Sequence, residues 1–123
     1  MSRVIALVDD LMFLSRIREA ARRRHLDVTA VRTLPDLLAA CAAPPRLVII
    51  DLDRGRPPAA EALAALRAEP ALAKLSVVGF FSHVHAERGR QAREAGCTAM
   101  PRSVFVEELD GLLAAPPAPG SLA

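Results

Sequence analysis

Short apolar runs alternate with amphipathic stretches along almost the whole chain, and this alternation constrains the fold most. The expected strands are residues 3–8, 28–32, 47–51, 76–81 and 98–100, and the expected helices are residues 11–24, 33–41, 60–68, 86–95 and 104–114. Strict alternation of strand and helix implies a parallel sheet with right-handed crossovers. We therefore predict an α/β, flavodoxin-like doubly wound domain, with a five-stranded parallel sheet in the order 2-1-3-4-5 and helices on both faces.

The length and composition are those of a single domain. The chain has 123 residues, of which 52% are hydrophobic, and this is enough apolar material for one core. All the expected strands and helices lie within residues 1–115. Residues 116–123 are rich in Pro, Gly and Ala, and we expect this C-terminal tail to be flexible.

Charge, aromatic content and cysteine spacing exclude several classes of protein. A net charge of +2 and 3% aromatic residues do not indicate binding to nucleic acid. The apolar run 4–8 is too short for a signal peptide or a membrane span. Cys41 and Cys97 are too far apart in the sequence to form a CxxC pair. We expect His83 and His85 to lie in a loop, a position favoured over a role in zinc binding. We expect a cytoplasmic protein that binds neither nucleic acid nor membrane.

Acidic residues end two of the expected strands. Asp9 and Asp10 follow the first strand, and Asp51 ends the third. These strands are neighbours in the predicted sheet, so the three carboxylates would converge at its carboxyl edge. Crowded carboxylates are costly without a cation, and Mg²⁺ prefers such hard oxygen ligands. The alternative is that Asp9 and Asp10 only cap the following helix while Asp51 merely ends a strand.

Three segments give the chain a resemblance to the receiver domains of response regulators, over residues 3 to about 114. The segments are Leu7-Val8-Asp9-Asp10, Val48-Ile49-Ile50-Asp51 and Val77-Val78-Gly79-Phe80-Phe81-Ser82. The resemblance implies that Asp51 accepts a phosphoryl group. It also implies that Asp9, Asp10 and Asp51 hold Mg²⁺ together with the backbone carbonyl of Asp53, and that Ser82 provides a hydroxyl that senses the phosphoryl group.

The sequence departs from the receiver pattern at the fifth strand. Arg102 stands where receivers have a lysine, and the only lysine, Lys74, lies toward the opposite edge of the predicted sheet. Arginine keeps the charge but is longer, planar and bidentate, so binding and switching could be separated. The aromatic residue that receivers use as a switch is also missing, because Ala99 or Met100 occupies its place.

These features lead to one leading hypothesis and two alternatives. The leading one is a stand-alone receiver, not an enzyme, phosphorylated on Asp51 by a histidine kinase or phosphotransfer protein, acting on a downstream protein as a monomer or weak homodimer. The second is a pseudo-receiver that binds a protein without phosphorylation, which Arg102 and the missing aromatic favour. The remote third is a haloacid-dehalogenase-like phosphatase, because Asp51-Leu52-Asp53 resembles its DxD motif, although on the third strand.

Overall fold

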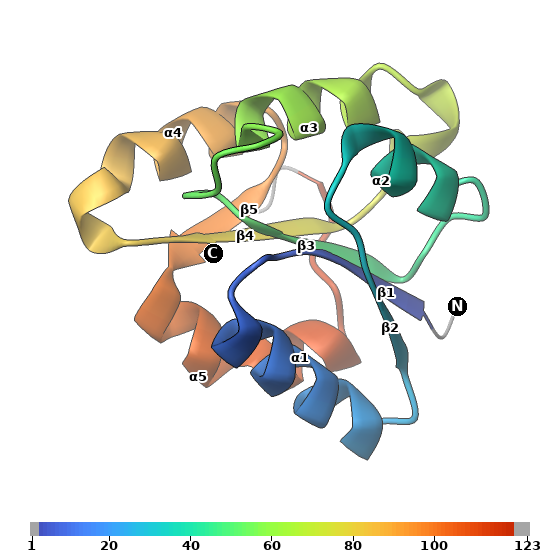
Figure 1. The fold of residues 1–123 in the computed structure, drawn as a ribbon, viewed down its shortest axis with the longest axis vertical. Helices are drawn as coiled ribbons and strands as arrows, with labels where there is room; N and C mark the ends of the chain where they lie inside the picture. The colour runs from blue at the N-terminus through green and yellow to red at the C-terminus, as the bar shows by residue number, and fades with distance from the viewer. Residues whose placement is uncertain (1–2, 120–123) are drawn as a thin grey trace.

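The computed structural model describes residues 3–119, which form a five-stranded parallel sheet in the order β2-β1-β3-β4-β5 with helices on both faces (Figure 1). The strands are β1 (Arg3–Leu7), β2 (Asp27–Ala30), β3 (Leu47–Asp51), β4 (Val77–Phe81) and β5 (Thr98–Pro101). The helices are α1 (Leu11–Arg23), α2 (Leu34–Ala40), α3 (Ala59–Arg67), α4 (Ala86–Glu94) and α5 (Arg102–Ala114), with two short 3₁₀ helices, η1 (Pro70–Leu72) and η2 (His83–His85). The predicted fold class and strand order are confirmed.

The central strands are buried on both faces because each face carries its own layer of helices. Helices α1 and α5 cover one face, and α2, α3 and α4 cover the other (Figure 1). Alternate residues of β3 enter opposite cores: Ile49 packs on the side of α1 and α5, while Val48 and Ile50 pack on the other. This explains why the strand reads as a continuous apolar run instead of an alternating one.

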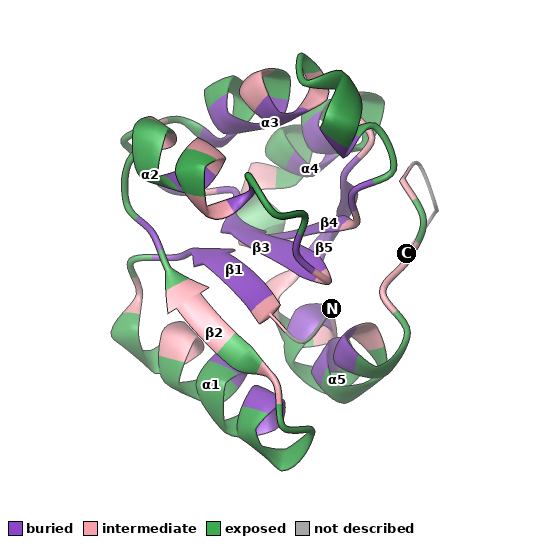
Figure 2. Cartoon of the chain, turned by 90° about the vertical axis from the view of Figure 1, so that its right-hand side faces the viewer, coloured by how far each residue is buried: buried purple, intermediate pink, exposed green. Residues whose placement is uncertain are grey.

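The helices bury only the side that faces the sheet, as the burial colours show (Figure 2). In α1 the buried residues are Ile17, Ala20 and Ala21, at the spacing of one helical face. The outward sides of the helices are exposed. No helix within residues 3–119 is long and apolar enough to span a membrane.

Every predicted element is present, but two boundaries differ in an informative way. The predicted strand 28–32 is wrong at both ends, since β2 runs over Asp27–Ala30. Its length is set by its pairing with β1, which extends from the Arg3–Asp27 pair to the Ala6–Ala30 pair. The last helix begins at Arg102, not at 104, so Arg102 is its first residue directly after Pro101. The one-turn helices η1 and η2 were not predicted, since three residues carry no detectable periodicity.

Asp10 caps α1, as one of the two aspartates considered for that role, and Thr33 caps α2. The Asp10 carboxylate accepts from the N–H groups of Met12 at 2.9 Å and Phe13 at 3.1 Å, and the Thr33 hydroxyl accepts from Asp36 N–H at 3.2 Å. Gly96 follows α4 with φ +83°, a left-handed conformation that a glycine adopts without strain. Capping side chains therefore set the starts of α1 and α2, and the left-handed backbone of Gly96 lets the chain turn after α4.

The predicted flexible tail, residues 116–123, lies partly outside the described residues, because 120–123 are not described. Within the described part, the Ser76 hydroxyl donates to Pro117 O at 2.6 Å. The Arg46 guanidinium donates to the carbonyls of Leu113 at 2.8 Å and Ala114 at 2.6 Å at the end of α5. The flexibility of the tail stays a prediction.

Two helical glycines give opposite predictions for stability. A Cβ at Gly89 would overlap the buried ring of Phe81, whereas a Cβ at Gly111 would meet nothing within 4 Å. Gly89→Ala should lower the free energy of unfolding by about 1–3 kcal/mol, while Gly111→Ala should raise it by about 0.5–1 kcal/mol through helix propensity. Urea unfolding measures both. Equal changes for the two variants would show that α4 does not pack this closely on β4.

Candidate functional site

The predicted acids lie at one edge of the sheet, where Asp10 and Asp51 share Arg102 while Asp9 pairs with Arg54. Asp9 and Asp10 follow β1 and Asp51 ends β3, and these strands are paired neighbours. Ser82 follows β4 and Arg102 follows β5 at the same carboxyl edge. This edge is where ligands bind in doubly wound sheets.

Arg102 lies among three carboxylates from different segments. Its guanidinium nitrogens are 3.8 Å from the Asp10 carboxylate, 3.5 Å from that of Asp51 and 3.6 Å from that of Asp53. These are ion-pair distances, longer than those of short charged hydrogen bonds. The chain thus provides its own cation at the point where the three acids converge.

Two aromatic rings and the helix start fix the position of Arg102. The guanidinium carbon lies 5.0 Å from the ring centroid of Phe13 and 5.5 Å from that of Phe80, within the range of a cation–π interaction. The rings of Phe13 and Phe80 are themselves stacked at 4.8 Å. Within residues 3–119 the Nε atom of Arg102 is buried without a hydrogen-bond partner, which shows how far the side chain is drawn inward.

Asp9 and Asp10 have different surroundings. Asp10 caps α1, as the simpler alternative predicted, and also faces Arg102. Asp9 is about half exposed and lies 3.4 Å from the guanidinium of Arg54, whose side chain is 2% exposed. Arg54 donates to the carbonyls of Pro57 at 3.0 Å, Arg32 at 3.3 Å and Arg56. Sequence reasoning missed Arg54, because a loop arginine usually extends into solvent.

Among the acids of the site, Asp53 has the carboxylate that accepts the most hydrogen bonds. Its Oδ2 accepts from Ser82 N–H at 2.7 Å, and its Oδ1 lies 3.0 Å from His85 Nδ1 and accepts from Arg88 at 3.1 Å. Its own N–H donates to Asp51 Oδ1 at 2.9 Å. The prediction assigned a role only to the backbone carbonyl of Asp53, so the contacts of its carboxylate were missed.

Ser82 contributes its backbone to these contacts. The N–H of Ser82 binds Asp53, and the hydroxyl does not cap η2. The predicted sensing role of the hydroxyl stays a prediction. His85 lies beside Asp53 in the one-turn helix η2, within the segment that connects β4 to α4.

The environments of Asp51 and Asp53 shift their pKa values in opposite directions. Burial raises the pKa of Asp51 and outweighs the lowering by the N–H of Asp53 and by the charge of Arg102. Burial also raises the pKa of Asp53, but hydrogen bonds from Ser82 N–H, His85 and Arg88 together lower it below its ordinary value. Asp53 is therefore the better stabilised anion, although Asp51 is the predicted phosphoacceptor.

The residues in this arrangement do not fit a divalent cation. No group of three or more Asp, Glu, His or Cys side chains within residues 3–119 is placed to hold a metal ion. Asp9 faces Arg54, while Asp10, Asp51 and Asp53 face Arg102. A cation among them would have to displace a guanidinium that already neutralises them. The Mg²⁺ site of Asp9, Asp10, Asp51 and the Asp53 carbonyl stays a prediction.

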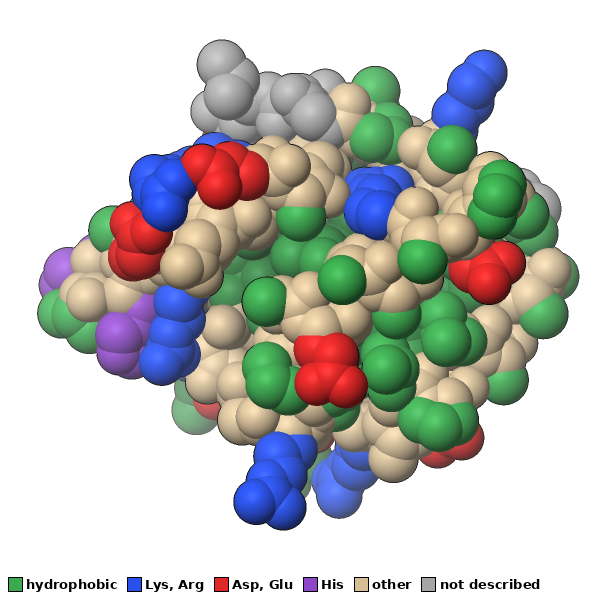
Figure 3. Space-filling view, turned by 90° about the horizontal axis from the view of Figure 1, so that it is seen from above, with side chains coloured by type: hydrophobic (Ala, Val, Ile, Leu, Met, Phe, Trp, Pro, Cys, Tyr) green, Lys and Arg blue, Asp and Glu red, His purple; other side chains and the backbone are tan. Residues whose placement is uncertain are grey.

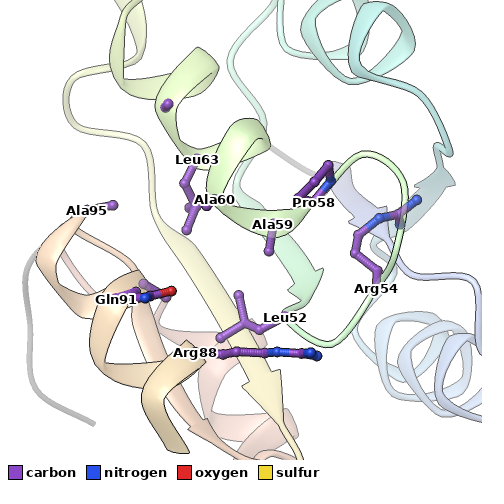
Figure 4. A pocket seen from close by; sticks show the side chains of 11 residues that line it. Leu52, Arg54, Pro58, Ala59, Ala60, Leu63, Arg88, Gln91 and Ala95 are labelled. Carbon is purple, nitrogen blue, oxygen red and sulfur yellow. The ribbon is translucent and has the colours of Figure 1, made fainter. Parts of the chain in front are cut away.

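A groove of about 290 Å³ lies between α3 and α4, next to the site. Hydrophobic side chains are visible in the hollow on this face (Figure 3), and Leu52, Ala59 and Leu63 line the groove. Arg88 extends from α4 past Leu52 along one side (Figure 4) and reaches Asp53. Arg54 and Arg88 line the groove and also contact Asp9 and Asp53, so the groove adjoins the acidic site.

The fold is similar to those of solved response regulators. The phosphorylated cyanobacterial phytochrome response regulator RcpA has a TM-score of 0.77 at 18% identity, over 98% of this chain and 99% of its own. The chemotaxis regulator CheY4 of Vibrio cholerae has 0.77 at 16% identity, over 93% and 97%. The Mn²⁺-bound response regulator Rcp1 has 0.76 at 14% identity, over 97% and 99%. This chain has the receiver fold.

The receiver fold is established by structure and not by sequence similarity. No protein-family model matches the sequence, and no curated protein matches it. The identities of 14–18% to the three receivers show the fold alone. What the site does must therefore be argued from its own residues.

The opposite pKa shifts predict opposite effects of neutralising the two acids. Asp53→Asn should lower the free energy of unfolding by about 1–3 kcal/mol at about pH 7. Because the pKa of Asp53 is lowered in the folded state, this loss should vanish as the pH falls through the folded-state pKa. The raised pKa of Asp51 means that ionisation costs stability as the pH rises, so Asp51→Asn should be neutral or stabilising near neutral pH.

Urea unfolding of the wild type and both variants across the acid range measures these differences. The test also has a built-in comparison, since both variants replace an aspartate of the same strand end by its neutral isostere. If Asp51→Asn proved more destabilising at neutral pH than Asp53→Asn, the assignment of the two environments would be wrong.

Proposed function

We propose that this chain is a receiver-fold signalling module that acts through protein contact and does not require phosphorylation. The observation that carries the proposal is the position of Arg102 among Asp10, Asp51 and Asp53. Phosphoryl chemistry at a carboxylate needs a free nucleophilic oxygen and a cation that is able to neutralise the incoming group. Here the cation is part of the chain and already paired.

The surface at the same edge supports a role in protein binding. The large hydrophobic side chains that are exposed within residues 3–119 are Leu11, Met12, Val84 and Val106. Three of them follow the ends of β1 and β4, next to residues that contact Arg102 or Asp53. Exposed apolar side chains beside a rigid charged cluster are typical of protein contact sites.

Phosphorylation of Asp51 by a histidine kinase or phosphotransfer protein is the second candidate. It is favoured by the place of Asp51, at the end of β3 with a cationic side chain 3.5 Å away. In this candidate Arg102 would swing from Asp10 and Asp53 toward the phosphoryl group, which its bidentate fork could bind. In this candidate function the phosphorylation of Asp51 would depend on Mg²⁺ and would take place in the cytoplasm.

Acetyl phosphate and beryllofluoride distinguish the two candidates. The proposed function predicts that the wild type, treated with either reagent and millimolar Mg²⁺, gains no mass and shows no change in its amide NMR spectrum. The phytochrome response regulator RcpA, whose phosphorylated form has been crystallised, is the positive control. A modification that occurs in the wild type and is lost in Asp51→Asn would overturn the proposal in favour of the second candidate.

A further inference from the structure

The carboxylate of Asp53 is contacted by donors from four segments beyond its own loop. Ser82 N–H and Arg102 approach Oδ2 at 2.7 and 3.6 Å, and His85 and Arg88 approach Oδ1 at 3.0 and 3.1 Å. These donors come from the residue after β4, from η2, from α4 and from the start of α5. The side chain is only 11% exposed, so the contacts are shielded from solvent.

The same set of donors would suit an oxygen of a bound anion. A backbone N–H beyond a strand and two guanidinium groups are the donors that proteins use for phosphate and carboxylate groups. We propose that Asp53 is a built-in anion, a positioning residue that holds residues 82–88 against the edge of the sheet. The inference rests on the proposed function, since an anion supplied by the chain makes an added phosphoryl group unnecessary for this arrangement.

The position of Asp53 is itself fixed by the end of β3. Its N–H is held by Asp51, and the preceding Leu52 is buried against Gly79, where a Cβ would lie 2.7 Å from the Leu52 side chain. The loop after β3 therefore cannot turn the carboxylate away without moving packed side chains. On the other side of the contact, η2 presents Val84, which is 72% exposed. Asp53 thus connects the buried strand end to an exposed apolar side chain.

Removal of the carboxylate should release residues 82–88. In Asp53→Ala the amide proton of Ser82 should exchange with solvent about tenfold faster or more, because it loses a charge-assisted hydrogen bond. Asp27→Ala, an exposed aspartate on β2, is the matched control and should leave this rate unchanged. Asp53→Asn keeps the shape of the side chain but not the charge, and it should also raise the exchange rate. It serves in place of Asp53→Ala if that variant does not fold.

An added anion should replace the missing carboxylate. Inorganic phosphate or sulfate should slow the exchange of the Ser82 amide in Asp53→Ala toward the wild-type rate, because the alanine leaves space and removes the carboxylate to which Ser82 N–H, His85 and Arg88 are bound. The same salts should have no such effect on the wild type or on Asp53→Asn, and sodium chloride at equal ionic strength is the salt control.

Two results would overturn the inference. Unchanged exchange at Ser82 in both Asp53 variants would show that the carboxylate does not hold the segment. Faster exchange that neither phosphate nor sulfate slows would show that the donors do not form an anion site. Both readouts are made without a phosphodonor, so they are independent of acetyl phosphate labelling of Asp51, which tests the proposed function separately.

Discussion

The rest of the site depends on one interaction, the Arg102 guanidinium among the carboxylates at the carboxyl edge of the sheet. A parallel sheet that ends two adjacent strands on aspartates brings like charges together, and their repulsion must be offset by a cation. In this chain the cation comes from the first residue of α5. The charges are therefore balanced within the fold.

This internal cation also contacts the hydrophobic core. Phe13 on α1 and Phe80 on β4 stack on one another and lie under the guanidinium, so the packing on one face of the sheet positions a charge at its edge. A third ring, that of Phe105 on α5, packs against Phe80 with centroids 4.7 Å apart. The start of α5 is thus anchored by an aromatic cluster, and Arg102 is anchored with it.

Much of the fold and the outline of the site could be predicted from the sequence, for physical reasons. Buried parallel strands read as apolar runs, and an aspartate that directly follows such a run must lie at the carboxyl edge, so Asp9, Asp10 and Asp51 could all be placed at that edge. The direction of a loop side chain carries no such signal. Arg54 and the carboxylate of Asp53 turn inward because of tertiary contacts with residues 29–35 positions away or on another strand, and no local pattern records these.

Metal binding with and without Arg102 tests the central claim most directly. Binding of Mn²⁺, followed by its electron paramagnetic resonance signal and competed with Mg²⁺, would be compared in the wild type, Arg102→Ala and Arg56→Ala, an exposed arginine of the loop after β3. The account predicts no binding by the wild type or Arg56→Ala, and binding by Arg102→Ala that is lost when Asp51→Asn is added. Binding of the metal by the wild type as tightly as by Arg102→Ala would contradict it.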